Sequence, residues 1–328
     1  MKEFTINQNE AGQRFDKYLK KLLSNASASF IYKMLRKKNI VLNGKKADGT
    51  EKLNSGDMVK LFLSDETFDK FSTNDTVMDE FQALKSIDSS KLKVVYEDAD
   101  VIIINKPSGM LSQKAKPEDI SANEYILSYL IHKGELHADM IKTFKPSICN
   151  RLDRNTSGLL VAGKSLKGLQ EMAEALKQRS VQKYYRCIVK GELKEKTYLK
   201  GYLSKDEAKN KVTVLKELPA QKDAADEFVP IETEYRPISV AKGYTELEVH
   251  LITGRSHQIR AHLASIGHPI IGDMKYGKKE INDIFRKEAN IRSQMLHAYR
   301  IVFTDGREVI APTGKEYERA WDFIHGQQ

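Results

Sequence analysis

The sequence has little of what holds small secreted proteins together or anchors a chain in a membrane. Only Cys149 and Cys187 occur among 328 residues, without Cys-x-x-Cys spacing, so neither a disulfide framework nor a cysteine metal site is expected. No run of about 18 apolar residues is present, which argues against a membrane span. The segment Met1–Asn7 lacks the apolar core of a signal peptide. We therefore expect a cytoplasmic protein of globular composition.

Positive charge is unevenly spread over the chain, whose net charge is +9. Residues 1–63 carry 13 Lys/Arg against 6 Asp/Glu, whereas residues 64–88 carry 2 against 7. The remainder is mildly basic. This pattern predicts a basic module at 1–75, an acidic connector at 76–88 and a large domain at 89–328. Basic modules attract polyanions by counterion release, although basic charge alone is more often a solubility feature.

The basic module shows helix spacing followed by a hairpin signal. Residues 15–23 place apolar side chains at the spacing of an amphipathic helix, and a second helix is expected with Ser29 as its cap. Ile40–Leu42 and the turn Asn43-Gly44 then predict a hairpin. The acidic stretch that follows has weak periodicity, with a short helix expected around Met78–Leu84.

This helix–helix–hairpin order resembles the small RNA-binding domain named after ribosomal protein S-four. The alternative is a basic helix face that is merely solvated. The resemblance implies that the second helix and the hairpin face RNA phosphates, through Ser29, Lys33, Arg36, Lys37, Lys38 and Lys45.

The run Asn150–Val161 is the most informative stretch of the large domain. Asp153 lies between Arg151 and Arg154 in a turn-forming segment, directly before an apolar run that predicts a buried strand. The flanking guanidinium groups favour an ionised aspartate, which could act as a nucleophile or a base. Taken alone, the segment is more typical of a surface Arg-Asp-Arg turn.

Three further motifs accompany it. Asn105–Gly109 ends a predicted strand, and Lys183–Val189 is a strand-like run with a basic edge. Leu251–Leu263, followed by Gly267–Asp273, joins a strand through a glycine turn to a helix whose first turns are rich in donors. Helix N-termini with Arg and His side chains suit a phosphodiester, so Arg255 and His257 are candidate RNA contacts.

Two other interpretations of these motifs are weaker. Gly158–Ser165 matches the phosphate-loop pattern G-x-x-x-x-G-K-S, but its four intervening residues are the apolar run of the predicted strand, so we interpret the match as accidental. A zinc site from His257, His262 and His268 lacks both the i, i+4 pair and cysteines. We expect no metal and no nucleotide cofactor.

Together the four motifs resemble the RluA/RluC/RluD family of ribosomal large-subunit pseudouridine synthases, over about residues 91 to 315. Asn150 stands where that family usually has histidine; it keeps hydrogen-bonding capacity but cannot titrate. The resemblance implies an α+β fold: a mixed, mainly antiparallel sheet with flanking helices and a central cleft, preceded by the small α+β RNA-binding domain.

The resemblance also implies roles for residues. Asp153 would attack C1′ of the uridine or remove its 2′ proton, and Arg260 would pair with it. Tyr185 would stack on the uracil and help to remove the C5 proton. Because the nucleotide must be flipped out of folded RNA, Arg151 or Arg154 could fill the gap.

The expected activity is isomerisation of specific uridines in RNA, most like that of the enzymes acting on 23S ribosomal RNA. No redox or energy input is needed, in line with the expectation of no cofactor. The alternative is an RNA-binding or ribosome-assembly factor that has kept the fold and lost activity. A phosphate-loop nucleotide hydrolase is a third, weaker option. We expect a monomer whose partner is RNA.

Overall fold

The computed structural model describes residues 1–72, 74–219 and 227–326. The chain forms two compact units. The first comprises Met1–Ile103, Gln113–Asn150 and Val161–Glu174, and the second comprises Ile104–Ser112, Arg151–Leu160 and Ala175–Gln328. The chain therefore passes between the units several times, and the residues around Asp153 belong to the second unit.

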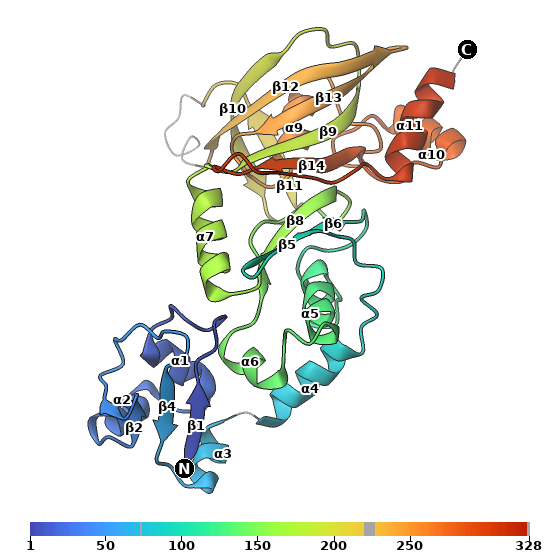
Figure 1. Cartoon of the computed structure of the whole chain (residues 1–328). Helices are drawn as coiled ribbons and strands as arrows, with labels where there is room; N and C mark the ends of the chain where they lie inside the picture. Colours follow the sequence, from blue (N-terminus) through green and yellow to red (C-terminus); the bar gives the residue numbers. More distant parts are fainter. Residues whose placement is uncertain (73, 220–226, 327–328) are drawn as a thin grey trace. The chain divides into compact units, whose positions relative to one another are not determined.

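The basic module forms the beginning of the first unit (Figure 1). Its strands form a sheet of order β1-β4-β2-β3, and the buried apolar faces of α1 and α2 share one core with this sheet. The spacing that predicted both helices is confirmed, since Phe15, Leu19 and Leu35 are almost completely buried. The elements are β1 (Lys2–Thr5), α1 (Phe15–Leu22), α2 (Ala28–Arg36), β2 (Ile40–Leu42), β3 (Lys45–Lys46) and β4 (Met58–Leu61).

The prediction that Ser29 caps the second helix is wrong. Ser27 has the extended backbone of an N-cap, and its hydroxyl accepts a hydrogen bond from the Phe30 N–H at 3.2 Å. Ser29 therefore lies inside the first turn. The predicted hairpin is present, with Asn43 and Gly44 both at positive φ between β2 and β3. Positive φ at both central residues is the geometry that Asn-Gly favours in a two-residue hairpin loop.

The acidic stretch contains two helices, α3 (Asp65–Phe71) and α4 (Asn74–Lys85). Phe68 of α3 joins the core of the module, and the expected helix around Met78–Leu84 lies within α4. Weak periodicity concealed the first of these helices, which is short and anchored by the two aromatic side chains Phe68 and Phe71. The expected boundary at residue 75 lies inside α4.

The rest of the first unit begins with β5 (Val94–Glu97). A capping box formed by Ser121 and Glu124 starts the first of the helices that follow. These elements are α5 (Ala122–His132), α6 (Ala138–Thr143) and β7 (Ser147–Ile148). Three further elements run from one unit into the other along the chain: β6 (Val101–Lys106), β8 (Ser157–Gly163) and α7 (Leu166–Lys177).

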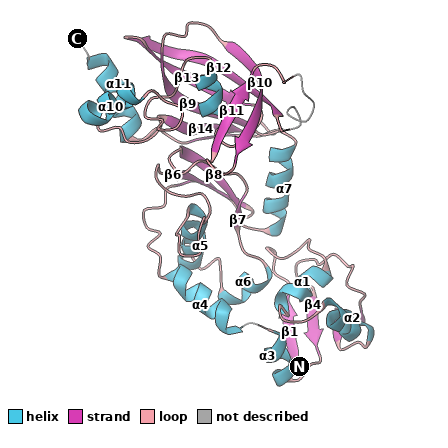
Figure 2. Cartoon of the chain, turned by 180° about the vertical axis from the view of Figure 1, so that it is seen from behind, coloured by secondary structure: helices cyan, strands magenta, loops and turns pink. Residues whose placement is uncertain are grey.

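The second unit is built on a curved sheet (Figures 1 and 2). Its strand order is β11-β10-β12-β13-β9-β14-β8, with antiparallel pairs throughout except the parallel pair of β14 and β8. This confirms the predicted mixed, mainly antiparallel sheet. The strands are β9 (Gln182–Lys190), β10 (Thr197–Asp206), β11 (Lys211–Leu215), β12 (Val229–Ala241), β13 (Tyr244–Leu251), β14 (Leu296–Val302) and β15 (Glu308–Ile310).

Among the residues described, three helices flank this sheet. Helix α9 (Gln258–Ser265) packs against β10, β11 and β12, whereas α10 (Lys279–Ala289) and α11 (Lys315–Gly326) pack on each other (Figure 1). Within the described ranges, no helix is long and apolar enough to cross a lipid bilayer. The position of α9 matters most, because its first turn faces the loop that carries Asp153.

Candidate active site

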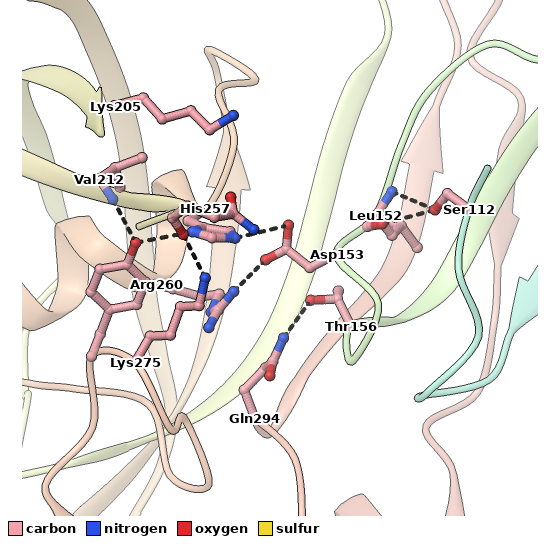
Figure 3. Close-up of polar contacts among 12 residues, drawn as sticks. Ser112, Leu152, Asp153, Thr156, Lys205, Val212, His257, Arg260, Lys275 and Gln294 are labelled. Carbon is pink, nitrogen blue, oxygen red and sulfur yellow. Dashed lines mark hydrogen bonds and ion pairs between the residues drawn. The ribbon is translucent and has the colours of Figure 1, made fainter. Parts of the chain in front are cut away.

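A short loop between Asn150 and β8 carries Asp153. The buried Leu152 is fixed at both of its backbone groups by Ser112, whose hydroxyl donates to the Leu152 carbonyl at 2.8 Å and accepts from its N–H at 3.0 Å (Figure 3). The Thr156 N–H donates to the Asp153 carbonyl at 3.0 Å and closes the turn. With Leu152 held inside, the next side chain points outward, and 25% of the Asp153 side chain is exposed.

Lys106, in the motif Asn105–Gly109, holds the backbone of this loop through hydrogen bonds. Its fully buried ammonium donates to the carbonyls of Pro107, Met110 and Arg154, at 3.0, 2.8 and 3.1 Å. Burial lowers the pKa of Lys106 to about 8, and the nearby Asp153 acts in the opposite direction. A buried cation that joins three carbonyls from two distant segments fixes the backbone directly after Asp153.

Gly158 lets the strand after the loop lie close to its neighbour. Its φ is +112°, and a Cβ atom there would lie 2.1 Å from the carbonyl oxygen of Ala298. Its partner in the parallel pairing of β8 and β14 is Ala298. A side chain at this position would push the two strands apart and move the loop.

Arg260 on α9 contacts Asp153 directly. One terminal nitrogen of its guanidinium donates to Asp153 Oδ2 at 2.7 Å, so the structure contains the ion pair that the family resemblance implies (Figure 3). The other edge forms a bidentate pair with Asp273, at 2.7 and 2.9 Å. Only 7% of the Arg260 side chain is exposed. Burial alone would lower the pKa of Arg260, but Asp273 and Asp153 together raise it.

Asp273 is a site residue whose role the sequence did not reveal. Its side chain is fully buried, and it also accepts hydrogen bonds from the N–H groups of Lys275 and Tyr276. The segment that holds it is tightly packed, since a Cβ at Gly272 would lie 2.1 Å from the Ser293 carbonyl oxygen. A lone acid after the apolar pair Ile270-Ile271 was the available signal, and it is a weak one.

His257 precedes α9 and approaches the second carboxylate oxygen. Its backbone is left-handed, with φ of 55°, and its Nε2 lies 3.9 Å from Asp153 Oδ1. Its Nδ1 forms a hydrogen bond with the Tyr276 hydroxyl at 3.0 Å. Burial lowers the pKa of His257, opposed by Asp153. Tyr276 is a second residue that sequence reasoning missed.

Gln258 holds the turn in front of α9. Its side-chain oxygen accepts from the Thr253 hydroxyl and the Arg255 N–H, while its amide donates to Thr233 and to the Glu232 carbonyl on β12. The glutamine therefore ties the helix start to the sheet. This anchoring explains how His257 and Arg260 reach the same carboxylate from adjacent positions on one turn.

Tyr185 lies on β9, opposite Val249 of β13 and Ala298 of β14. Only 6% of the residue is exposed, and its hydroxyl has no hydrogen-bond partner among the described residues. Burial raises its pKa, with a further contribution from Asp153. Tyr185 is thus a neutral phenol near the carboxylate. Its stacking role remains a prediction.

The other predicted RNA contacts are exposed and do not join this cluster. In the second unit, neither Arg151 nor Arg255 forms a hydrogen bond or ion pair with Asp153 among the described residues, and Arg154 donates to the Gly109 carbonyl at 3.0 Å. In the first unit the predicted contacts are all exposed, and within the described ranges no ion pair involves them. They are Ser29, Lys33, Arg36, Lys37, Lys38 and Lys45.

Asn150 has a backbone role in the first unit. Its side-chain oxygen accepts a hydrogen bond from the Val161 N–H at 2.8 Å.

The segment Gly158–Ser165, which matches the phosphate-loop pattern, lies mostly in the extended strand β8. Its amides therefore do not wrap around a phosphate. This contradicts the phosphate-loop interpretation.

The histidines of the weaker zinc interpretation have separate partners. His257 contacts Tyr276, His262 contacts Thr233, and His268 contacts the Lys190 carbonyl. Within the described ranges, no group of three or more His, Cys, Asp or Glu side chains is arranged to hold a metal ion.

Comparison with known proteins agrees with the family resemblance of the four motifs over most of the chain. Residues 100–265 match a family model described as RNA pseudouridylate synthase. The ribosomal large subunit pseudouridine synthase C of Vibrio vulnificus (strain CMCP6) is 29% identical over 321 residues, covering 96% of this chain and 93% of the relative. The synthase D of Escherichia coli (strain K12) is 30% identical over 274 residues, covering 83% and 75%.

A solved structure shares the fold. Human RNA Pseudouridylate Synthase Domain Containing 4 superposes with a TM-score of 0.59 at 17% identity, and the match covers 76% of this chain and 97% of that one.

Proposed function

This chain belongs to the RNA pseudouridylate synthase family, and we propose that it isomerises specific uridines of large-subunit ribosomal RNA with Asp153 as the essential carboxylate. The ribosomal substrate is proposed because the relatives that align with most of the chain are named as large-subunit enzymes. The reaction breaks the N1–C1′ bond, turns the uracil and joins C5 to C1′. The C5 proton leaves and N1 gains a proton, so the step needs no oxidant or reductant.

The observation that carries this proposal is the ion pair between Asp153 and Arg260. Arg260 donates to Asp153 Oδ2 at 2.7 Å while Asp273 holds the other edge of its guanidinium. The carboxylate is therefore oriented by a group that is itself fixed, which is the preorganisation that catalysis requires. Asp153 either attacks C1′ or removes the 2′ proton, and both routes need a positioned carboxylate.

The positions of the side chains support the remaining roles that we propose. Tyr185 stacks on the flipped uracil and assists removal of the C5 proton, from a buried position near Asp153. Arg151 and Arg154 are exposed beside the loop, where they can fill the gap that the flipped nucleotide leaves. Arg255 and His257 add contacts to the RNA at the start of α9.

The module formed by residues 1–75 holds the RNA through the exposed cations of its second helix and hairpin. Lys33, Arg36, Lys37, Lys38 and Lys45 have no ion-pair partners within the described ranges, so they are available to phosphates. We further propose a monomer that acts in the cytoplasm. Both Cys149 and Cys187 are free thiols, as expected for a reducing compartment.

The direct test is to map pseudouridines in total RNA of a strain that lacks the gene. Complementation with the wild-type gene should restore the lost sites, whereas Asp153→Asn should restore none of them, with turnover reduced at least about 10³-fold. The substitution is nearly isosteric, so the fold and RNA binding should persist.

Three other results would count against parts of the proposal. Restoration by Asp153→Asn would refute the catalytic aspartate. Sites confined to transfer RNA would refute the ribosomal substrate. A deletion strain with no missing pseudouridine would favour an inactive RNA-binding or assembly factor.

A further inference from the structure

His257 and Asp153 leave a gap of defined size between two polar atoms. Nε2 of His257 lies 3.9 Å from Oδ1 of Asp153, which is too long for a hydrogen bond between them (Figure 3). An oxygen atom placed beside this line could lie about 2.8 Å from both atoms, a normal hydrogen-bond distance. The other carboxylate oxygen already accepts from Arg260.

The hydrogen bonds around Tyr276 determine which nitrogen of His257 carries its proton. The Val212 N–H donates to the Tyr276 hydroxyl oxygen at 2.9 Å, so the single hydroxyl proton needs another acceptor. Among the described residues the remaining partner is His257 Nδ1, at 3.0 Å. In a neutral imidazole with Nδ1 accepting, Nε2 carries the hydrogen. Burial favours this neutral form by lowering the pKa of His257.

The gap therefore has a donor on one side and an acceptor on the other. His257 Nε2 offers a hydrogen, and Asp153 Oδ1 offers a lone pair. A hydroxyl group, which both accepts and donates, satisfies the two together. A carbonyl oxygen would leave the carboxylate oxygen unsatisfied, and an amine would leave the imidazole N–H unsatisfied.

The chemistry of RNA narrows this hydroxyl to one group. In an internal nucleotide, O3′ and O5′ are part of phosphodiesters and the ring oxygen carries no hydrogen, so the 2′-hydroxyl is the single ribose hydroxyl left. This group is attached to the carbon next to C1′, where Asp153 must act in the proposed function.

We infer that His257 and Asp153 together bind the 2′-hydroxyl of the target uridine, with Tyr276 as the residue that positions His257. This inference rests on the proposed function and makes His257 a specificity residue that distinguishes ribose from deoxyribose at the reacting nucleotide. The left-handed backbone at His257 directs the imidazole to this place, at a position where few side chains are favoured.

The test is a double-mutant cycle between the enzyme and the substrate. Single-turnover rates are measured on the target RNA and on the same RNA with one 2′-deoxyuridine at the target. The ratio of the two rates is then compared between wild type and His257→Asn. Intrinsic effects of the missing oxygen on the chemistry cancel, because both enzymes meet the same pair of substrates.

His257→Asn should make the ribose-to-deoxyribose ratio about tenfold smaller than in wild type, a typical effect of one lost hydrogen bond. Asparagine tolerates the left-handed backbone, and its amide ends near the position of Nδ1. In His257→Gln, the amide nitrogen reaches the position of Nε2, so the ribose-to-deoxyribose ratio should stay close to the wild-type value. In Tyr276→Phe, the ratio should lie between those of wild type and His257→Asn.

His262→Gln is the matched control. This buried histidine lies on the same helix and bonds Thr233 of β12, so its replacement should slow both substrates equally. An unchanged ratio in His257→Asn would overturn the inference and leave the gap to water.

Turnover of the all-ribose RNA by the wild-type protein tests the proposed function separately. Equilibrium affinities for the same RNA pair give the same ratio without turnover. A failure of the inference can therefore be told apart from a failure of the proposed function.

Discussion

The cations of α2 and the arginine of α9 differ in nearly every physical respect. Lys33, Arg36 and Lys37 are exposed and have no ion-pair partner within the described ranges. Arg260 has 7% of its side chain exposed and is paired on both edges of its guanidinium. Exposed charges contribute affinity that salt screens, whereas a buried, doubly paired guanidinium contributes geometry. Removing each kind should therefore change different observables.

Arg260→Ala should have the largest effect. Loss of the group that orients Asp153 should lower single-turnover activity about 100-fold, and saturating RNA should not restore it. The fold should also lose about 3–5 kcal/mol of unfolding free energy, because Asp273 is left buried without its partner. Activity assays and denaturant unfolding measure the two effects.

A double variant separates these effects. Arg260→Ala with Asp273→Asn removes the unpaired charge, so it should regain much of the stability and none of the activity. Arg255→Ala, an exposed residue before the same helix, should weaken only salt-sensitive binding. If Arg260→Ala becomes active at saturating RNA, Arg260 is a binding group like those of α2.

Acid should destabilise the second unit through the buried His297. Burial is the main reason that its pKa is lowered to about 4, and its two ring nitrogens bond Ser157 and the Ala311 carbonyl. Between pH 6.5 and pH 4 the unfolded chain binds a proton that the native state does not. Unfolding free energy should therefore fall with falling pH, by about 2 kcal/mol from pH 6.5 to pH 5.

The fluorescence of Trp321, the single tryptophan, reports unfolding of this unit. His297→Gln should flatten the pH dependence, whereas His325→Gln, at an exposed position, should leave it unchanged. The module at residues 1–75 contains no histidine and should not share this dependence. The same fall with pH in His297→Gln would assign the effect to other groups.

Replacing Lys33, Arg36 and Lys37 with alanine should have a smaller effect, about tenfold in RNA affinity at physiological salt. The slope of log affinity against log salt should become shallower by about 2 to 3, because three phosphate contacts are lost. Turnover at saturating RNA should stay near the wild-type value.

The matched control removes three lysines of the second unit that are also exposed, Lys194, Lys279 and Lys287. Both triple variants lose three positive charges. If both triple variants change the salt slope equally, the module attracts RNA by overall charge alone.

Ser27→Ala should have the smallest effect. Loss of the N-cap should destabilise α2 by about 1 kcal/mol, which hydrogen exchange of the helix amides can measure. Ser29→Ala should leave exchange nearly unchanged and act, if at all, on RNA binding. Equal effects of the two variants would contradict the assignment of Ser27 as the cap.

The sequence by itself determined the local elements and the location of the chemistry. Helix spacing predicted α1 and α2, and apolar runs bounded by turns predicted β6, β8 and β9. These elements are predictable because the pattern of buried side chains along each one depends on residues that are close in the sequence. The four motifs led to the family and to Asp153. The first helix of the acidic stretch escaped this reasoning, since two anchoring aromatics in one short helix, Phe68 and Phe71, are too few to produce a clear period.

Only the tertiary structure decided how the carboxylate is held. Arg260 and Asp153 are 107 positions apart, and the family resemblance, not local spacing, suggested that they meet. Neither spacing nor resemblance indicated that Asp273 holds the far edge of Arg260 or that Tyr276 orients His257. Such contacts depend on which segments fold against one another, and a buried polar network is specified by mutual geometry rather than by any local pattern.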